Sequence, residues 1–351
     1  KETVRTRARE LTAENSAKYG INWDSTSGST GTPLHFISDD TNQANKIAAL
    51  LRSYHWAGYR LGDLTLSLQS YYLSDRDFIH NSVYNVIRFD SNRLSRDSLR
   101  KLIGYLKGRK PKIIMGFPFD LVMLVKTARD DDVRLSSPKG IIVYGETLSS
   151  RKREILEDYF GCHVYNFYSL HENAAMISEC EAGNLHLLDD FACHEMIENP
   201  ESGGYSLVGT GYYNYAMPFI RYNIKDSVIL STVQACPCGR PFPLIETITG
   251  KECDYLETTD GRLLGAVMSH SIDNARGVIC SQCIQYSINN IEVKLVTEGN
   301  FTRQSQQNLE RDLRKRLGSE VCLSFSQVSE LEKTGSGKTP FIISKIGHRY
   351  F

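Results

Sequence analysis

Residues 25–33, near the start of the sequence, read Ser-Thr-Ser-Gly-Ser-Thr-Gly-Thr-Pro. The two glycines allow positive φ angles and let the backbone approach a ligand closely. Successive N–H groups in such a turn form a concave anion site, and six hydroxyls add hydrogen-bond donors without adding charge. The stretch therefore predicts a loop that binds a polyphosphate. The alternative is a flexible linker, although linkers rarely end on a proline between two structured stretches.

Bulk composition excludes several classes of protein. The 351 residues suffice for one large domain and one small domain. Lys and Arg balance Asp and Glu at 41 each, so no basic field indicates binding of nucleic acid or of an anionic membrane. No apolar run approaches the roughly 20 residues that span a bilayer. We expect no nucleic-acid partner and no membrane span.

Cysteine usage and the position of the loop give two further expectations. Nine cysteines, an odd number in a long chain, are typical of a reduced, cytoplasmic protein rather than of a disulfide framework. The glycine-rich loop begins about 25 residues into the sequence, which suggests a fragment that lacks an N-terminal segment of a longer protein.

Apolar periodicity predicts an α/β fold over the first half of the chain. Helical patterns alternate with short apolar runs, which is typical of helices layered on mainly parallel strands. The predicted helices cover residues 40–59, 97–106, 120–129 and 149–160, and the predicted strands cover residues 64–68, 112–115, 140–144 and 164–168. Runs at residues 205–208, 219–222 and 227–230 then predict more β-structure. In such sheets, ligands bind where the strands end.

A smaller unit is predicted after Asp254. Residues 291–296 and 321–328 are predicted strands. Between them, leucines 309, 313 and 317 form one face of a helix that Gly318 can end. We therefore expect two domains, residues 1–254 and residues 255–351.

Seven motifs carry a resemblance to a known family. They are residues 25–33, Gly145-Glu146, Tyr-Ser-Leu-His-Glu at 168–172, residues 218–226, Cys-Pro-Cys-Gly-Arg at 236–240, residues 250–254 and Gly337-Lys338. Their order resembles the phenylacetate–CoA ligase family of adenylate-forming enzymes, and most closely its branch of capsular polysaccharide biosynthesis proteins. The resemblance covers the chain from about Trp23 onward. It implies an α/β fold with a large adenylate-forming N-terminal domain of layered sheets and helices, and a small mobile α+β C-terminal lobe.

The resemblance implies a nucleotide site assembled from several of these motifs. The β,γ-phosphates of ATP would be held by Ser27, Gly28, Ser29, Thr30 and Gly31. The adenine would be bordered by Gly145, Glu146 and Thr147 and flanked by Tyr168. Asp226 would accept hydrogen bonds from the ribose, and Glu172 would hold Mg²⁺, which prefers oxygen ligands. Taken singly, Asp226 and Glu172 would instead be read as a turn residue and as an acid at a helix start.

A lysine near the C-terminus is the expected catalytic residue. Residues 334–339 read Thr-Gly-Ser-Gly-Lys-Thr, but Glu332 replaces the first glycine of a Walker loop and a strand-like run follows. The resembled family carries a catalytic lysine on a mobile loop at this place. Lys338 would accordingly reach the substrate carboxylate and the α-phosphate and offset their negative charge. The alternative is a solvated lysine in a Gly/Ser turn.

Cysteine and histidine spacing predicts a structural zinc site. Cys236 and Cys238 form a close thiol pair, and Cys180 and His186 lie in another loop. Three sulfurs and one imidazole can make a closed tetrahedral zinc site, which members of the resembled family often hold. A rival set uses Cys280 and Cys283, and a further alternative is a group of independent free thiols.

Two motifs depart from the resembled family. Ser169 stands where glycine is usual and narrows the approach to the nucleotide, and His171 replaces a small hydroxyl residue, where it is expected to bind the carboxylate or to mark an altered substrate. Lys251 replaces an arginine, which keeps the charge near the nucleotide but loses the planar fork. Asp254, at the end of the same motif, still matches the interdomain hinge of the resembled family.

The expected activity is that of an AMP-forming ligase. A small-molecule carboxylate would react with Mg·ATP to give an acyl-adenylate, which would pass to a thiol (coenzyme A or a carrier protein) or to an amine. The motif departures motivate an alternative function, that of a nucleotide-binding, zinc-stabilised scaffold in a polysaccharide-assembly complex.

Overall fold

The structure is a computed structural model. It describes residues 1–25, 34–69, 71, 73, 75–199, 204–251, 256–259, 263–264, 272, 275–318, 320–334 and 338–346. Five residues expected to hold phosphates lie outside the described residues: Ser27, Gly28, Ser29, Thr30 and Gly31. The expected hinge residue Asp254 lies outside them as well.

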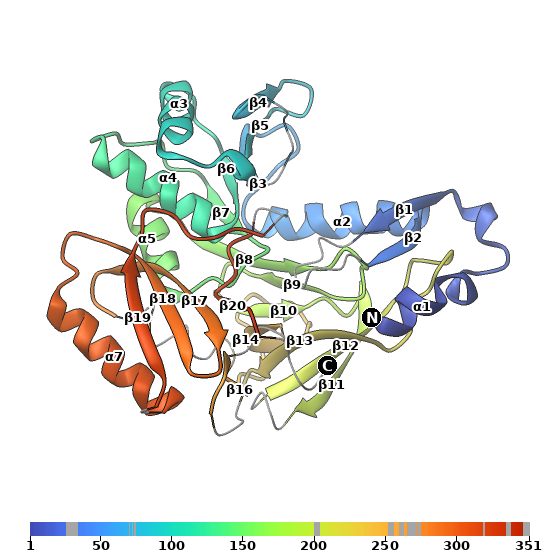
Figure 1. Cartoon of the computed structure of the whole chain (residues 1–351). Helices are drawn as coiled ribbons and strands as arrows, with labels where there is room; N and C mark the ends of the chain where they lie inside the picture. Colours follow the sequence, from blue (N-terminus) through green and yellow to red (C-terminus); the bar gives the residue numbers. More distant parts are fainter. Residues whose placement is uncertain are drawn as a thin grey trace.

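Five neighbouring parallel strands lie toward one edge of a 12-stranded sheet (Figure 1). In spatial order they are β5 (Val86–Asp90), β3 (Thr65–Gln69), β6 (Ile113–Gly116), β7 (Gly140–Val143) and β8 (Val164–Ser169). These strands are short and rich in β-branched residues, which suits a parallel sheet buried on both faces. β4 (Phe78–Asn81) pairs antiparallel with β5 and closes one edge.

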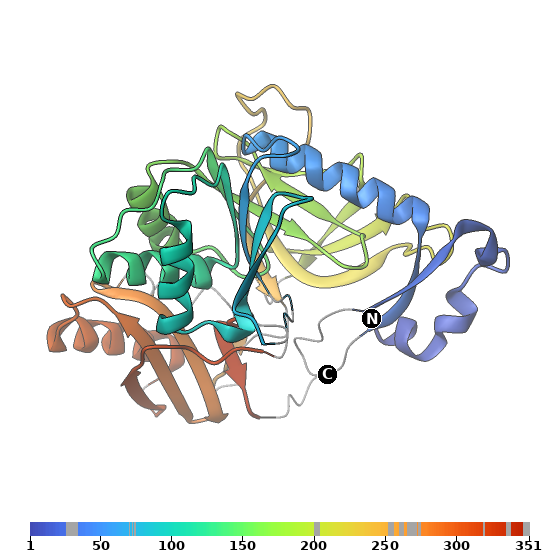
Figure 2. The ribbon, with the colours of Figure 1, turned by 90° about the horizontal axis from the view of Figure 1, so that it is seen from above.

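Helices cover both faces of this parallel region. The main hydrophobic core lies between the sheet and α3 (Arg96–Leu106), α4 (Pro118–Asp130) and α5 (Ser150–Phe160). On the opposite face, α2 (Asp40–Trp56) packs over residues of β6, β7 and β8, as Figure 2 shows from above. The alternation of helices and parallel strands is the one that the sequence predicts.

The sheet continues from β8 as antiparallel strands. β9 (Met176–Glu179) pairs with β8, and the order then runs through β10 (Leu185–Leu187), β14 (Leu244–Lys251), β13 (Tyr222–Leu230), β12 (Gly204–Gly211) and β11 (Ala192–Asn199). A second core forms beneath this part of the sheet. The β-structure predicted after residue 185 is therefore confirmed.

The N-terminal segment brings together the two ends of the glycine-rich loop. After α1 (Glu2–Leu11) and a 3-10 turn (Ser16–Tyr19), β1 (Ile21–Ser25) pairs antiparallel with β2 (His35–Asp39). The register places Ser25 opposite His35. The buried Asp39 carboxylate caps α2 at Asn42 and also accepts hydrogen bonds from the backbone of Tyr215 and Ala216. These bonds fix the hairpin against the large sheet.

The small lobe has its own four-stranded sheet and core. The sheet order is β19 (Cys322–Gln327), β18 (Asn290–Thr297), β17 (Val278–Ser287) and β20 (Ile342–Ser344). α7 (Arg303–Leu317) packs on it through three leucines, in the predicted pattern. A short ribbon of β15 (Leu256–Glu257) and β16 (Leu263–Leu264) joins this lobe, since Gln285 bonds both backbone groups of Glu257.

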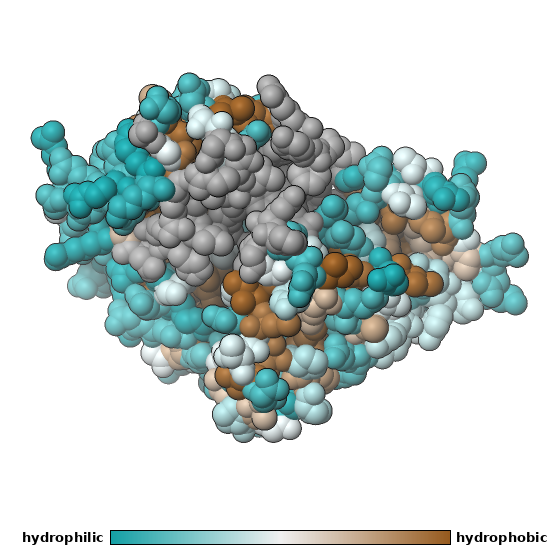
Figure 3. All heavy atoms as spheres, turned by 90° about the horizontal axis from the view of Figure 1, so that it is seen from below, coloured by the Kyte–Doolittle hydropathy of each residue, from teal (hydrophilic) through white to brown (hydrophobic). Residues whose placement is uncertain are grey.

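The small lobe is docked against the large domain, beside α4 and α5 in both ribbon views (Figures 1 and 2). Ile279 and Val296 reach into the main hydrophobic core of the large domain. Arg151 of α5 forms an ion pair with Glu298 at 3.0 Å. In the space-filling view from below, hydrophilic residues dominate the rim and apolar residues show near the middle of the face (Figure 3).

One sequence expectation differs from the structure in detail, and some strands had no prediction. The predicted strand at 219–222 is wrong over most of its length, because β13 begins at Tyr222. Arg221 has a φ of 47°, which interrupts extended backbone, and the Phe219 carbonyl bonds back to the Gly211 amide. The sequence also gave no prediction for β5 or β17. Among the described residues, no helix has the length and apolar character needed to cross a bilayer.

Candidate active site and metal centre

The candidate active site lies at the carboxyl ends of β7 and β8, where parallel sheets bind ligands. Gly145 follows β7 with a φ of 79°, a conformation that suits glycine. A Cβ at this position would lie 2.8 Å from the Phe117 ring and 3.4 Å from Cε of Lys338. Glycine is therefore required here by both the backbone and the close neighbours.

A segment of the small lobe reaches this turn. The Thr339 amide donates a hydrogen bond to Oε1 of Glu146, while the Phe119 amide donates to Oε2 at 3.3 Å. The Lys338 amide donates a hydrogen bond to Oγ1 of Thr334 at 3.2 Å, and the Lys338 carbonyl accepts one from the Thr334 amide at 2.8 Å. The structure thus brings Lys338 from the C-terminal lobe to Gly145 and Glu146 of the large domain, although nearly 200 residues separate them.

The motif after β8 contributes two buried carboxylate contacts. Tyr168 donates a hydrogen bond to Oδ2 of Asp226, and Tyr222 donates one to Oε1 of Glu172 at 2.7 Å. Both carboxylates are buried. Burial and the neighbouring Asp226 carboxylate raise the pKa of Tyr168 well above its usual range, so the tyrosine remains a donor at neutral pH.

Lys251 and Asp226 lie on neighbouring strands. The backbone register of β13 and β14 places them directly opposite each other. Ser169 is exposed at the end of β8, and Thr147 is exposed just after Glu146. The described part of the nucleotide motif set therefore converges on one end of the sheet.

His171 lies near the start of the glycine-rich loop. Its Nδ1 is 3.9 Å from Oδ1 of Asp24, the next-to-last residue of β1. Desolvation by the surrounding protein atoms lowers the pKa of His171, and the Lys46 ammonium lowers it further. The carboxylates of Asp24 and Glu172 oppose this shift. His171 is therefore mainly neutral at pH 7 and can donate or accept a hydrogen bond.

Lys46 is a candidate site residue that the sequence reasoning missed. It lies on α2 in the inward stripe formed with Asn42, Ala49 and Ser53. Burial lowers the pKa of Lys46, and the carboxylates of Asp24 and Glu172 partly restore it. The sequence did contain a signal for Lys46: it is a lysine at an inward-facing position of a helix whose other inward residues are small or polar.

A buried ion pair joins the two domains beside Glu146. Lys333 of the small lobe lies 2.6 Å from Oδ1 of Asp120 and donates to the Ser91 carbonyl at 3.0 Å. Asp120 at the start of α4 is fully buried. Burial raises the pKa of Asp120 to about 6, Lys333 acts against this shift, and Glu146 adds to it.

We expect the Asp120 carboxyl to make stability depend on pH. A carboxyl with a raised pKa stabilises the fold most when protonated, and this contribution is lost as pH rises from about 4 to about 6. The free energy of unfolding of the wild type should fall by about 3 kcal/mol relative to Asp120→Asn over this range. Denaturant unfolding of both proteins at several pH values measures the difference. A difference that is constant across the range would contradict the assignment.

Four predicted metal ligands come together beside Trp56, at the C-terminal end of α2. The ligand atoms of Cys180, His186, Cys236 and Cys238 all lie within 4.8 Å of one another. The Sγ atoms of Cys180 and Cys236 are 3.5 Å apart, and Sγ of Cys238 is 3.4 Å from Nε2 of His186. The edge between two sulfurs of a tetrahedral zinc site is about 3.8 Å, given the usual Zn–S bond. The donor set and its spacing therefore fit a zinc ion.

The surroundings of this cluster suit a structural metal. The His186 ring is fully buried and packs edge-on against Trp56 of α2 at 5.7 Å. Arg240 stacks over the same tryptophan at 4.2 Å, and Asn184 donates to the Cys236 sulfur at 3.2 Å. The cluster thus connects α2 to the segment that leads into β14.

The rival set of cysteines is not assembled. Cys280 and Cys283 are both buried on β17, but Cys280 belongs to the main hydrophobic core and Cys283 to the small-lobe core. They lie on opposite faces of the strand and cannot share one metal ion.

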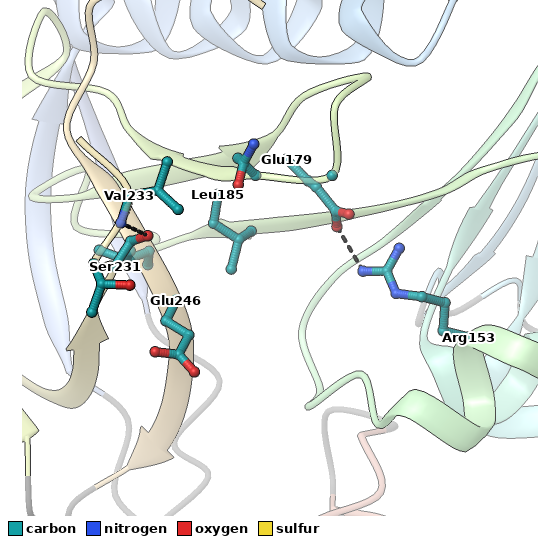
Figure 4. A pocket seen from close by; sticks show the side chains of 10 residues that line it. Arg153, Glu179, Leu185, Ser231, Val233 and Glu246 are labelled. Atoms are coloured by element: carbon teal, nitrogen blue, oxygen red, sulfur yellow. Dashed lines mark hydrogen bonds and ion pairs between the residues drawn. The ribbon is translucent and has the colours of Figure 1, made fainter. Parts of the chain in front are cut away.

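A cavity of about 360 Å³ lies beside the metal loop, between β9, β10 and β14 (Figure 4). None of the predicted catalytic or nucleotide-binding residues lines it. Arg153 on its wall is already paired with Glu179 at 2.8 Å. This cavity is therefore separate from the candidate active site.

Comparisons with known proteins agree with the fold. Residues 256–345 match the family described as CapK C-terminal domain. The chain is 26% identical to Protein CapK of Staphylococcus aureus over 337 residues, which covers 92% of this chain and 74% of that protein.

Solved structures agree as well. The crystal structure of 2-hydroxyisobutyryl-CoA ligase in the postadenylation state, with R3-HIB-AMP, has a TM-score of 0.74 at 15% identity over 97% of this chain and 79% of that chain. The same ligase in the thioesterification state, with 2-HIB-AMP and CoA, has a TM-score of 0.58 at 16% identity over 98% of this chain and 79% of that chain. This chain is therefore a homologue of Protein CapK with a CapK C-terminal domain, and it has the fold of the adenylate-forming CoA ligases, as the order of its motifs predicted.

Proposed function

We propose that this protein is an AMP-forming ligase that activates a small-molecule carboxylate as an acyl-adenylate. The observation that carries the proposal is the position of Lys338, which reaches from the small lobe to Gly145 and Glu146 at the end of β7. A cation held there meets a substrate bound at the carboxyl ends of the strands. It would offset the negative charge that accumulates when a carboxylate attacks a phosphate.

The placement of the small lobe supports this step of the reaction. The two crystal structures of 2-hydroxyisobutyryl-CoA ligase are of one protein, yet this chain resembles the postadenylation state more than the thioesterification state. We propose that the docked arrangement serves adenylate formation and that the lobe, beginning at residue 255, then rotates about Asp254. The rotation would remove Lys338 and admit the acceptor, which is coenzyme A, a carrier thiol or an amine.

We propose roles for the other site residues as well. The loop at 27–31 and Lys46 would bind the phosphates of ATP. Tyr168 and Asp226 would hold the nucleoside, and His171 would contact the substrate carboxylate. Glu172 offers carboxylate oxygens for Mg²⁺, which would neutralise phosphate charge.

The cysteine and histidine cluster would hold a structural Zn²⁺ rather than a catalytic one. Four protein ligands close its coordination, so no open position remains for a substrate. Eight free thiols among the described residues fit a reducing, cytoplasmic compartment. Similarity to Protein CapK makes polysaccharide biosynthesis the proposed context.

A screen for carboxylate-dependent exchange between ATP and pyrophosphate tests the proposed activity. We expect exchange with at least one acid in a panel of aryl, fatty, amino and dicarboxylic acids, with trapping of the adenylate by hydroxylamine. Binding of ATP without exchange across the panel would contradict the ligase and favour a nucleotide-binding scaffold.

A further inference from the structure

On strands β3 and β5, polar side chains occupy one face of the sheet, where apolar side chains are usual. On β3 and β5, the residues facing the main core are apolar, for example Leu66 and Ile87. The alternate residues Ser67, Gln69 and Arg88 face the side on which α2 packs. Parallel sheets buried on both faces normally carry apolar residues on both.

Ser67 and Gln69 are hydrogen-bonded to two tyrosines, and Arg88 lies over the ring of one of them. Tyr71 donates to Oγ of Ser67 at 2.7 Å, and Tyr144 donates to Oε1 of Gln69 at 2.9 Å. The guanidinium carbon of Arg88 lies 5.2 Å from the centre of the Tyr71 ring. We call these five residues the polar cluster.

The polar cluster is deep in the protein and yet partly accessible. Burial raises the pKa of Tyr144 and of Tyr71 above the usual tyrosine range. Nevertheless, Tyr71, Gln69, Arg88 and Tyr144 each retain accessible surface. Side chains that only filled a core would be fully buried, as Leu66 is.

Arg88 carries a charge that the described protein does not balance. Its Nε is buried and makes no hydrogen bond. In the part of the chain that the structure describes, no ion pair involves Arg88. A half-buried guanidinium with no ion pair among the described residues is available to a ligand that brings an anion.

The polar cluster adjoins the candidate active site. Tyr144 directly precedes Gly145, against which Lys338 lies. Phe117 bridges the two places, since its ring is 6.1 Å from that of Tyr144 and touches the space at Gly145. A molecule whose carboxylate meets Lys338 would therefore extend along Tyr144 toward Arg88.

We propose that the acid which this protein activates carries a second anionic group, which Arg88 receives within the polar cluster. The substrate class is a short dicarboxylic acid or a carboxylic acid with a comparable anionic substituent. This assignment rests on the proposed ligase function, which supplies the reacting carboxylate at Lys338. Guanidinium and carboxylate match in geometry and charge, and the hydroxyl and amide groups of the cluster complete the hydrogen bonds.

The experiment compares dicarboxylic acids with their methyl monoesters, which keep the shape and lose one charge. Binding is read from the thermal midpoint in the presence of ATP, and activation from ATP–pyrophosphate exchange. For the wild type we expect dicarboxylates to raise the midpoint and to support exchange better than the monoesters. In Arg88→Gln this preference should fall roughly 10- to 100-fold, the effect of one charge-assisted hydrogen bond.

Two further variants keep the result interpretable. Arg88→Lys should retain part of the preference, because the charge remains without the planar fork. Arg109→Gln is the matched control, since Arg109 also stacks on a tyrosine, Tyr105, at 3.8 Å but is exposed outside the site. It should leave the preference unchanged.

The outcomes separate this inference from the proposed function. The inference is overturned if the wild type prefers monoesters, or other acids without a second charged group, in either readout. It is also overturned if Arg88→Gln keeps an unchanged preference. The ligase function stands in both cases. Dicarboxylate binding that depends on Arg88, without any exchange, supports the anionic subsite and overturns the ligase function instead.

Discussion

Replacing Lys338 with alanine is expected to abolish adenylate formation almost completely. The residue supplies a cation from the small lobe beside Gly145, where we propose that it meets the reacting carboxylate and the α-phosphate. Charged groups that stabilise such transition states contribute roughly 10³- to 10⁵-fold to rates. Carboxylate-dependent pyrophosphate exchange should fall by that order, while ATP binding measured by calorimetry changes little.

The second half-reaction provides the sharpest contrast for this variant. If the lobe rotates after the first step, Lys338 is absent from the site during transfer to the acceptor. Lys338→Ala supplied with chemically prepared acyl-adenylate should therefore still acylate the thiol at close to the wild-type rate. Lys345→Ala, an exposed lysine on the same lobe, should behave as the wild type in both steps. Exchange that persists in Lys338→Ala would remove the assigned role.

Local patterns were sufficient to predict the frame of the molecule. The helices at α2, α3, α4 and α5 and the strands between them follow from periodicity and capping, and each lies within a few residues of its expected bounds. These elements are continuous in sequence and amphipathic. The spacing of apolar residues along the chain therefore shows which side chains face the core. β17 was missed because it carries three buried polar residues, Ser281, Gln282 and Gln285, and the hydrogen bonds of the two glutamines form only in the folded lobe.

Site residues without a motif could not be found from sequence alone. Arg88 lies on a strand that no sequence pattern singled out, and its role depends on its contact with Tyr71 and on its unpaired Nε. Lys333 is one of many lysines until Asp120 is found opposite it. Contacts of this kind join segments more than 200 residues apart, and only the fold specifies them.

The metal cluster shows the intermediate case. Residue types and spacing suggested the ligands but left Cys280 and Cys283 as rivals. A metal site depends on the directions of the ligand side chains as well as on the residue types. The structure assembles one set within 4.8 Å and turns the rival pair toward two different cores. Metal binding by this set remains a prediction.

Removal of the metal is expected to have the largest effect on stability. The cluster joins the loop after β9 to the segment before β14 and supports Trp56 of α2, so its loss would free several connections at once. Binding energies of structural zinc sites are on the order of 10 kcal/mol and act directly as folding free energy. We expect His186→Ala to contain almost no zinc by elemental analysis and to lose roughly 5 kcal/mol or more of unfolding free energy.

The pH dependence of metal binding gives an independent check on the same site. Burial raises the pKa of Cys180 to about 11, so the thiol is protonated in the metal-free protein at neutral pH. A metal ion must displace this proton, and its apparent affinity should therefore rise as pH rises toward that value. Cys193→Ser, which alters an exposed cysteine on β11, is the matched control and should keep both the metal and the stability. Full stability of the wild type after complete chelation would contradict the predicted loss of unfolding free energy. Hydrogen bonds and packing alone would then hold these loops.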